Sequence, residues 1–196
     1  MCSSDLIYFL KDVLSEIINR TLETSKVTFG DYEIDFSKEW EVITVKEAFL
    51  TFAGMTPEEA IAKNEFEILL TEKVEPNLPK NVPVILKDYP PQMAALSKIN
   101  EETGSAERWE LYLGGIEIAN AYSELIEYSE HKRRFETSHK KRTERKLSKY
   151  PDDMAFFECL KYGIKPFTGC ALGVDRLVMI LANEKNIRNV NFFAEF

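Results

Sequence analysis

Residues 107–126 constrain the fold most strongly, because they are typical of two β-strands joined by a tight turn at Gly114-Gly115. A two-residue turn at these glycines makes Tyr112 face Glu117 across an antiparallel pair. We therefore expect antiparallel pairing at the centre of the fold, with helices packed around it.

Acidic residues gather on this hairpin. Strict alternation makes Glu110 and Glu117 diagonal neighbours on one face, together with Ala119, and within joint reach of one divalent cation. Glu124 then points to the other face. A bulge near Asn120-Ala121, or the end of the strand there, would return it to the acidic face. The same spacing also fits an exposed hairpin whose acids are only solvated.

The flanking segments have recognisable periods. Residues 5–20 have the spacing of an amphipathic helix, and residues 27–36 alternate as a short hairpin. Capping boxes at Thr44–Glu47 and Thr56–Glu59 indicate two or three small helices between 44 and 75. The remaining predicted elements are a strand at 84–86, a charged helix at about 129–148, a helix ending near Gly163, and a closing strand and helix. The fold class is α+β, with residues 1–196 as one domain and a small helical insertion at about 44–80.

Composition excludes several classes of protein. The 196 residues are 44% hydrophobic and carry a net charge of -8, which argues against a protein that coats nucleic acid. Three unpatterned cysteines indicate neither a disulfide framework nor a zinc site. No apolar run approaches the roughly 20 residues of a membrane span, so we expect a cytoplasmic protein with no membrane partner.

A second informative segment lies near the C-terminus. Gly169, Ala171 and Gly173 alternate along a predicted strand that a flat or bulky ligand can approach closely, and Arg176 follows in the first turn of an apolar helix. A guanidinium beside open backbone suits a phosphate or a stacked base. The alternative is a buried strand-to-helix crossover with a surface arginine.

A basic segment lies between these two motifs. Residues 127–149 contain nine Lys/Arg and four Asp/Glu. Such a cluster suits docking of a nucleic acid or of an acidic protein. It is also typical of a solvated helix face.

The motifs GIEIANAYSEL and TGCALGVDRLVM together resemble the class II lysyl-tRNA synthetase family, more closely its branch that ligates lysine to elongation factor P. The Pro90–Leu96 segment is also similar. The resemblance covers about residues 5–190. Ala at position 171 resembles the elongation factor P branch, since the synthetases typically have Gly there. The resemblance implies the antiparallel sheet of a class II catalytic domain, incomplete on its N-terminal side.

The same resemblance implies a site for ATP and Mg²⁺. Glu110 and Glu117 would hold the metal and the nucleotide phosphates. Ile118 and Gly173 would line the nucleotide site. Arg176 would be the catalytic residue, stacking on adenine and reaching the γ-phosphate.

For the amino acid, the resemblance implies contacts from Asn120, Glu124 and Ala171, with Glu124 pairing the ammonium group of a lysine side chain. The implied reaction activates lysine or β-lysine as an adenylate and transfers it to elongation factor P. The alternatives are a lysyl-tRNA synthetase-like domain acting on tRNA and a non-catalytic fragment that binds nucleotide or a partner chain.

Some positions depart from the family pattern. Ala121 stands where the family usually has Gly, and Ile126-Glu127 stands where Thr-Asp or Asn-Asp is usual. The first and second family motifs are not found in residues 1–30, and Arg20 is the only arginine before Arg108. We therefore expect a homodimer or a complementing N-terminal fragment to complete the site.

Overall fold

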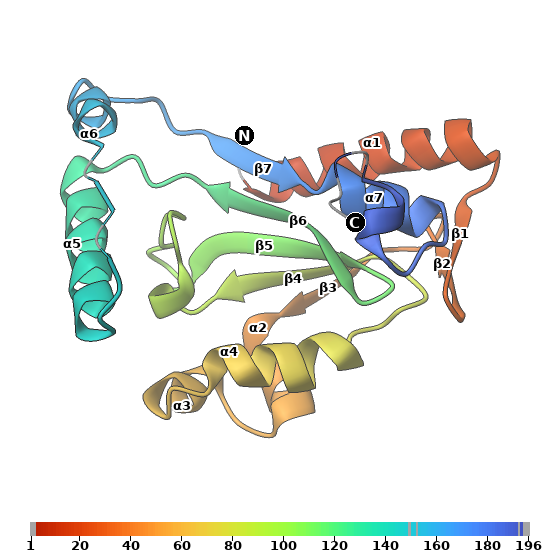
Figure 1. Cartoon of the computed structure of the whole chain (residues 1–196), viewed down its shortest axis with the longest axis horizontal. Helices are drawn as coiled ribbons and strands as arrows, with labels where there is room; N and C mark the ends of the chain where they lie inside the picture. Colours follow the sequence, from red (N-terminus) through yellow and green to blue (C-terminus); the bar gives the residue numbers. More distant parts are fainter. Residues whose placement is uncertain (1–2, 149, 152, 192, 194–196) are drawn as a thin grey trace.

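The computed structural model describes residues 3–148, 150–151, 153–191 and 193. Its centre is a five-stranded sheet in the order β3-β4-β5-β6-β7 (Figure 1). The strands are β3 (Glu41–Thr44), β4 (Val84–Tyr89), β5 (Ala106–Leu113), β6 (Ile116–Ser123) and β7 (Thr168–Leu172). All neighbours are antiparallel except β3 and β4, which run parallel. The α+β prediction is confirmed, whereas β3 was not predicted: its four residues lead directly into the capping box at Thr44, where helices were expected.

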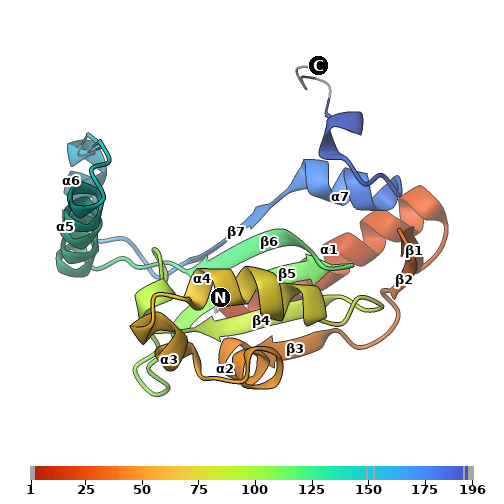
Figure 2. The ribbon, with the colours of Figure 1, turned by 60° about the horizontal axis from the view of Figure 1, so that its bottom comes forward.

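One face of the sheet packs on α1 (Ser3–Leu22), the hairpin of β1 (Lys26–Phe29) and β2 (Tyr32–Asp35), and α7 (Val174–Leu181). Alternate strand residues and the apolar side of α1 bury a common core here, with Leu14 and Ile18 fully buried. The helix predicted over 5–20 and the hairpin predicted over 27–36 are confirmed (Figure 2). The strand residues in this core are Ile85, Trp109, Leu111, Leu113, Ile118, Ala119 and Ala121.

The opposite face packs on the helical segment between β3 and β4. This segment contains α2 (Val45–Ala48), η1 (Phe49–Ala53), α3 (Pro57–Ala62), α4 (Phe66–Leu69), η2 (Leu70–Val74) and η3 (Glu75–Asn77). Both predicted capping boxes form, with Thr44 and Thr56 as N-cap residues. Their helices bury a second core against β4 and β5.

The β5–β6 hairpin forms as predicted at its turn. Both turn glycines have positive φ, +57° at Gly114 and +85° at Gly115, and Tyr112 pairs with Glu117. The next pair, however, joins Leu111 to Ala119, so Ile118 is an extra residue in β6. The bulge therefore lies at Ile118 rather than near Asn120-Ala121.

This bulge corrects one predicted face. Because one extra residue reverses the alternation, Ala119 turns into the α1 core instead of joining Glu110. Asn120 takes its place directly opposite Glu110.

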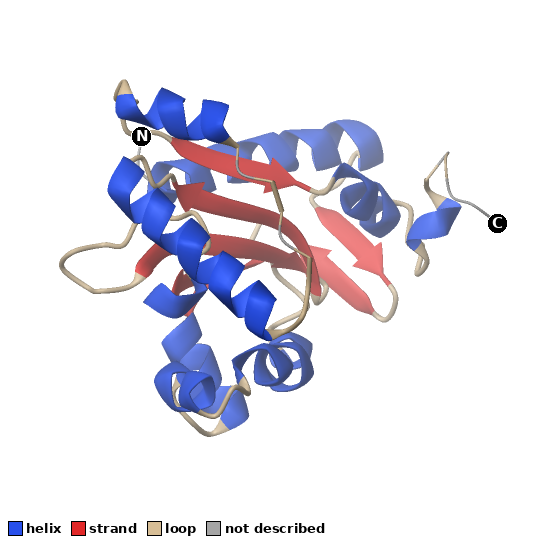
Figure 3. Cartoon of the chain, turned by 60° about the vertical axis from the view of Figure 1, so that its left-hand side comes forward, coloured by secondary structure: helices blue, strands red, loops and turns tan. Residues whose placement is uncertain are grey.

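The connection from β6 to β7 forms α5 (Tyr128–Glu144) and α6 (Met154–Lys161), which pack together beyond one end of the sheet (Figure 1). Figure 3 is turned so that this side of the molecule comes forward. The predicted helix over 129–148 is shorter than expected. It ends at Glu144, because Lys146 adopts the left-handed conformation with φ +57°. The helix predicted to end near Gly163 is confirmed. Two short 3₁₀ turns, η4 (Pro91–Met93) and η5 (Ile187–Asn189), complete the described elements.

No helix among the described residues is both long enough and apolar enough to cross a lipid bilayer.

Candidate functional site

The predicted site residues of the two strand motifs lie on β5, β6 and the edge strand β7. Glu110 pairs with Asn120 across β5 and β6, and Asn120 pairs with Ala171 across β6 and β7. Since Glu124 lies four residues after Asn120, the Ile118 bulge also brings it to this face. The predicted return of Glu124 is thus produced by a bulge two residues earlier than expected.

Glu110 is the centre of a buried hydrogen-bond network. Glu110 is buried, with 5% of the residue exposed. The hydroxyls of Tyr89 and Tyr112 donate to Oε2 at 2.6 and 2.8 Å, and the Asn120 amide donates to Oε1 at 3.1 Å. The Arg108 guanidinium also donates to Oε1 and forms an ion pair. These four donors use all the acceptor positions of the carboxylate.

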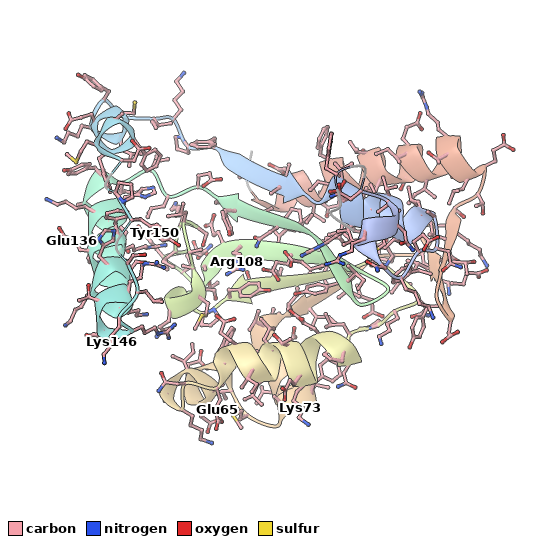
Figure 4. All side chains as sticks on the ribbon, viewed as in Figure 1. Glu65, Lys73, Arg108, Glu136, Lys146 and Tyr150 are labelled. Atoms are coloured by element: carbon pink, nitrogen blue, oxygen red, sulfur yellow. The ribbon has the colours of Figure 1, made fainter. Side chains whose placement is uncertain are left out.

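Arg108 makes two further contacts beside its ion pair with Glu110. Its guanidinium lies over the ring of Tyr89, 4.3 Å from the centroid, and it donates to the carbonyl of Met93 at 2.8 Å. Figure 4 shows Arg108 over the middle of the sheet. The ion pair with Arg108 compensates the charge of the buried Glu110 carboxylate.

Asn120 presents a free acceptor. A carboxylate can only accept hydrogen bonds, so the Asn120 atom facing Glu110 is Nδ2, and Oδ1 points elsewhere. Oδ1 is buried and has no hydrogen-bond partner among the described residues. An unpaired buried acceptor costs free energy that a ligand donor would recover.

Glu124 is a half-buried carboxylate for which the described residues supply neither a hydrogen bond nor an ion pair to its oxygens. Burial raises its pKa, while the nearby His131 acts in the opposite direction. Gly169 makes room for it: a Cβ added there would lie 2.7 Å from Glu124 Oε1. Such a carboxylate is suited to pairing with an ammonium group of a ligand.

The predicted nucleotide residues meet at the bulge. The carbonyl of Ile118 accepts the N–H of Gly173 at 2.8 Å, which joins β6 to the start of α7. Arg176, in the first turn of α7, donates to the carbonyl of Glu117 at 2.8 Å and to its Oε2 at 3.2 Å. Gly173, Arg176 and Ala171 are exposed. The bulge carbonyl and the first turn of α7 thus bring an exposed cation next to β6.

Glu110 and Glu117 are the two carboxylates predicted to hold Mg²⁺. Within residues 3–148, 150–151, 153–191 and 193, no group of three or more His, Cys, Asp or Glu side chains is arranged to hold a metal. A cation at Glu110 would have to displace one of its four donors, whereas the Glu117 side chain is 36% exposed and pairs with Arg176. Magnesium binding by Glu110 and Glu117 stays a prediction.

Four side chains of the network were not predicted as site residues: Glu75, Tyr89, Arg108 and Tyr112. Arg108 and Glu110 alternate on one strand, a signal that the sequence did contain. Nothing in the local sequence of Glu75 indicates its position, since it reaches Tyr112 from the helical segment between β3 and β4.

A separate cavity of about 770 Å³ lies between α5, α6 and residues 91–99. Its cationic residues include Arg133 and Arg134, both of which form ion pairs with Glu130. Phe156 and Phe157 supply apolar lining. The basic cluster of the sequence is therefore partly neutralised within its own helix.

Comparisons with known proteins agree with the motifs. Residues 1–196 match the family model described as tRNA synthetases class II (D, K and N). The chain is 33% identical over 192 residues to an elongation factor P–(R)-β-lysine ligase of Buchnera aphidicola, covering 93% of this chain and 58% of the relative. It is 32% identical to the ligase of that name from Hamiltonella defensa, over 95% of this chain and 60% of the relative.

A lysine–tRNA ligase of Methanoculleus marisnigri is 30% identical over 214 residues, which cover 98% of this chain and 42% of that protein. The chain thus spans less than two thirds of the length of each of these relatives. The comparisons confirm the resemblance that the two motifs indicated.

Proposed function

Since the chain belongs to the class II tRNA synthetase family (D, K and N), we propose that it carries the amino-acid side of an ATP-dependent aminoacyl ligase site. The proposed substrates are lysine or β-lysine and ATP, and the proposed acceptor is elongation factor P. We further propose that residues 1–196 form one catalytic domain, with the helical segment at about 44–80 as an insertion.

The observation that carries this proposal is the environment of Glu124. It is a half-buried carboxylate without a cationic partner among the described residues, and Gly169 leaves space beside it. Burying an unpaired carboxylate is unfavourable, so its natural partner is a cation supplied by the substrate. Lysine and β-lysine both carry a side-chain ammonium group that meets this need.

Asn120 and Arg176 complete the proposed roles. The free Oδ1 of Asn120 would accept a hydrogen bond from the second ammonium group of the amino acid. Arg176 would bind the phosphates of ATP as the amino-acid carboxylate oxygen attacks the α-phosphorus and pyrophosphate leaves. The acceptor amine would then attack the acyl carbon of the adenylate, lose a proton and release AMP.

Positioning and charge neutralisation would provide most of the catalysis. Magnesium, when bound, would neutralise phosphate charge, and Glu117 is the carboxylate whose exposure suits that contact. Glu110 would hold Asn120, and it would contact the metal by giving up one of its four donors.

The test is lysine-dependent exchange of pyrophosphate into ATP by the 196-residue chain. We expect exchange in the wild type and its loss in Glu124→Gln, whose amide cannot pair an ammonium charge. Glu127→Gln, an exposed change three residues away, is the matched control and should retain exchange. An inactive wild type at high protein concentration would refute ligase activity for this chain alone. The hypothesis of a non-catalytic fragment would then remain.

Acceptor assays then distinguish a ligase that acts on elongation factor P from one that acts on tRNA. We expect transfer of labelled lysine or β-lysine to elongation factor P. Transfer to tRNA instead would favour the synthetase-like alternative.

A further inference from the structure

Glu75 lies in a fixed position beside the predicted site although it belongs to neither motif. It is half-buried at the start of η3, between the buried side chains of Val74 and Leu78. These apolar anchors hold the segment against the sheet, and Glu75 Oε1 lies 3.0 Å from the Tyr112 hydroxyl. Lys73, on the same helical segment, lies on its outer side in Figure 4.

A continuous chain of hydrogen bonds starts at this contact. Tyr112, 1% exposed, reaches Glu110 Oε2 at 2.8 Å, and Glu110 Oε1 accepts the Asn120 amide at 3.1 Å. Glu75, Tyr112, Glu110 and Asn120 thus connect η3 through β5 to β6. The chain ends at Asn120 Oδ1, the buried acceptor without a partner.

The number of protons in this chain is informative. The Tyr112 hydroxyl has one proton and lies within hydrogen-bond distance of two carboxyl groups. If both carboxyls were ionised, one of the two contacts would bring oxygens together with no proton between them. A proton on one of the two carboxyl groups would remove this conflict.

The surroundings decide which carboxyl this is. Glu110 accepts additional hydrogen bonds from the Arg108 guanidinium and the Tyr89 hydroxyl, so its oxygens already face donors. Glu75 has no ion pair among the described residues. The charged groups that act on it are Glu67 of α4, Glu110 of β5 and Glu117 of β6, all acidic.

These surroundings favour the neutral form of Glu75. Burial raises the pKa of Glu75, and the three acidic neighbours raise it further, whereas a hydrogen bond donated by Tyr112 to the ionised carboxylate would lower it. The proton count and the electrostatics therefore agree.

We propose that Glu75 is a positioning residue of the amino-acid site: as a neutral acid it donates to Tyr112, which directs the Tyr112 proton to Glu110 and so fixes the Asn120 amide. Asn120 then presents Oδ1 as an acceptor. The role of Glu75 in positioning Asn120 for the amino acid rests on the proposed function, whereas the series of hydrogen bonds from Glu75 to Asn120 does not. The helical segment between β3 and β4 becomes part of the site through this one side chain.

Glu75→Gln and Glu75→Ala test the donor. Gln can still donate to the Tyr112 oxygen, whereas Ala cannot, so at about pH 5 we expect urea unfolding to show lower stability for Ala than for Gln. In a Tyr112→Phe background the two should be equally stable, because the acceptor oxygen is missing. Glu72→Gln, an exposed change on η2, is the control and should resemble wild type. If the difference in unfolding free energy between Glu75→Ala and Glu75→Gln is unchanged in the Tyr112→Phe background, the proposed hydrogen bond between Glu75 and Tyr112 is refuted.

The pH dependence provides a second measurement. A neutral Glu75 stabilises the fold fully below the ordinary glutamate pKa of about 4.3 and loses this contribution as pH rises through its raised folded value. Wild type should therefore lose stability relative to Glu75→Gln above about pH 4.3. A difference that does not change with pH would show that Glu75 is not the proton donor.

The positioning role of Glu75 is tested by pyrophosphate exchange. Glu75→Ala should raise KM for lysine roughly tenfold with a smaller effect on kcat, and Glu75→Gln should restore it, as expected for one lost hydrogen bond. A wild-type protein without exchange activity would refute the proposed function. Urea unfolding of the Glu75 variants, with and without Tyr112→Phe, would then still test the hydrogen bonds between Glu75 and Asn120. Active wild type with an unchanged KM in Glu75→Ala would refute the positioning role.

Discussion

Arg176 and Glu117 are joined by two hydrogen bonds, since one guanidinium nitrogen donates to both the backbone carbonyl and the carboxylate of Glu117. The backbone contact at 2.8 Å holds the guanidinium beside β6, while the 3.2 Å side-chain contact neutralises it in part. Both side chains are partly exposed. A phosphate that binds Arg176 would therefore compete with Glu117 for it, or share it.

This relationship makes Arg176→Ala informative. Under the proposed function we expect pyrophosphate exchange to fall by roughly 10²–10³, the usual loss when one preorganised charge-stabilising group is removed. Because Arg176 is exposed, stability should change by no more than about 0.5 kcal/mol. The measurements are exchange kinetics and urea unfolding of the same samples. Full activity in the variant would exclude Arg176 as a phosphate-binding residue.

Gly169→Ala should weaken lysine binding without unfolding the protein. The new methyl group would lie 2.7 Å from Glu124 Oε1, too close for a contact, so the flexible carboxylate must move. The change can be followed by isothermal titration with lysine. Cys170→Ala, on the adjacent residue that points to the other face of β7, is the control. Equal affinity of all three proteins would show that Glu124 does not need this space.

We expect Glu130 to contribute to the folding stability of the protein in a way that is lost at acid pH. Its hydrogen bonds with Arg133, together with Arg134, lower its pKa to about 2. Its stabilising effect is thus complete above the ordinary value of about 4.3 and is lost as pH falls towards 2. Glu130→Gln should cost about 1 kcal/mol or less at neutral pH and nothing near pH 2. Unfolding curves of both proteins between these values measure this, and a constant difference would contradict it.

Leu14→Ala should destabilise the α1 face strongly. Leu14 is fully buried in the core shared by α1 and the sheet, so its removal leaves a cavity and should cost about 2–5 kcal/mol. Tyr8→Ala, on the same helix but 70% exposed, should change stability by about 0.5 kcal/mol or less. Similar losses from both variants would mean that α1 does not pack through the Leu14 side.

The local sequence predicted the elements of the hairpin but not the faces of its side chains. Gly114-Gly115 determined the turn and the first cross-strand pair, because few other residues adopt positive φ at both turn positions. The bulge at Ile118 has no comparable signal. It forms where the Ile118 carbonyl accepts the N–H of Gly173, a contact between residues far apart in the chain.

The sequence by itself therefore determined the family, the α+β class, the two capping boxes and the identity of most candidate site residues. Only the tertiary structure decided that Asn120 rather than Ala119 faces Glu110, and that Glu75 joins them through Tyr112. The physical reason is that strand alternation reverses with a single extra residue, and that a buried hydrogen-bond network depends on contacts between distant segments.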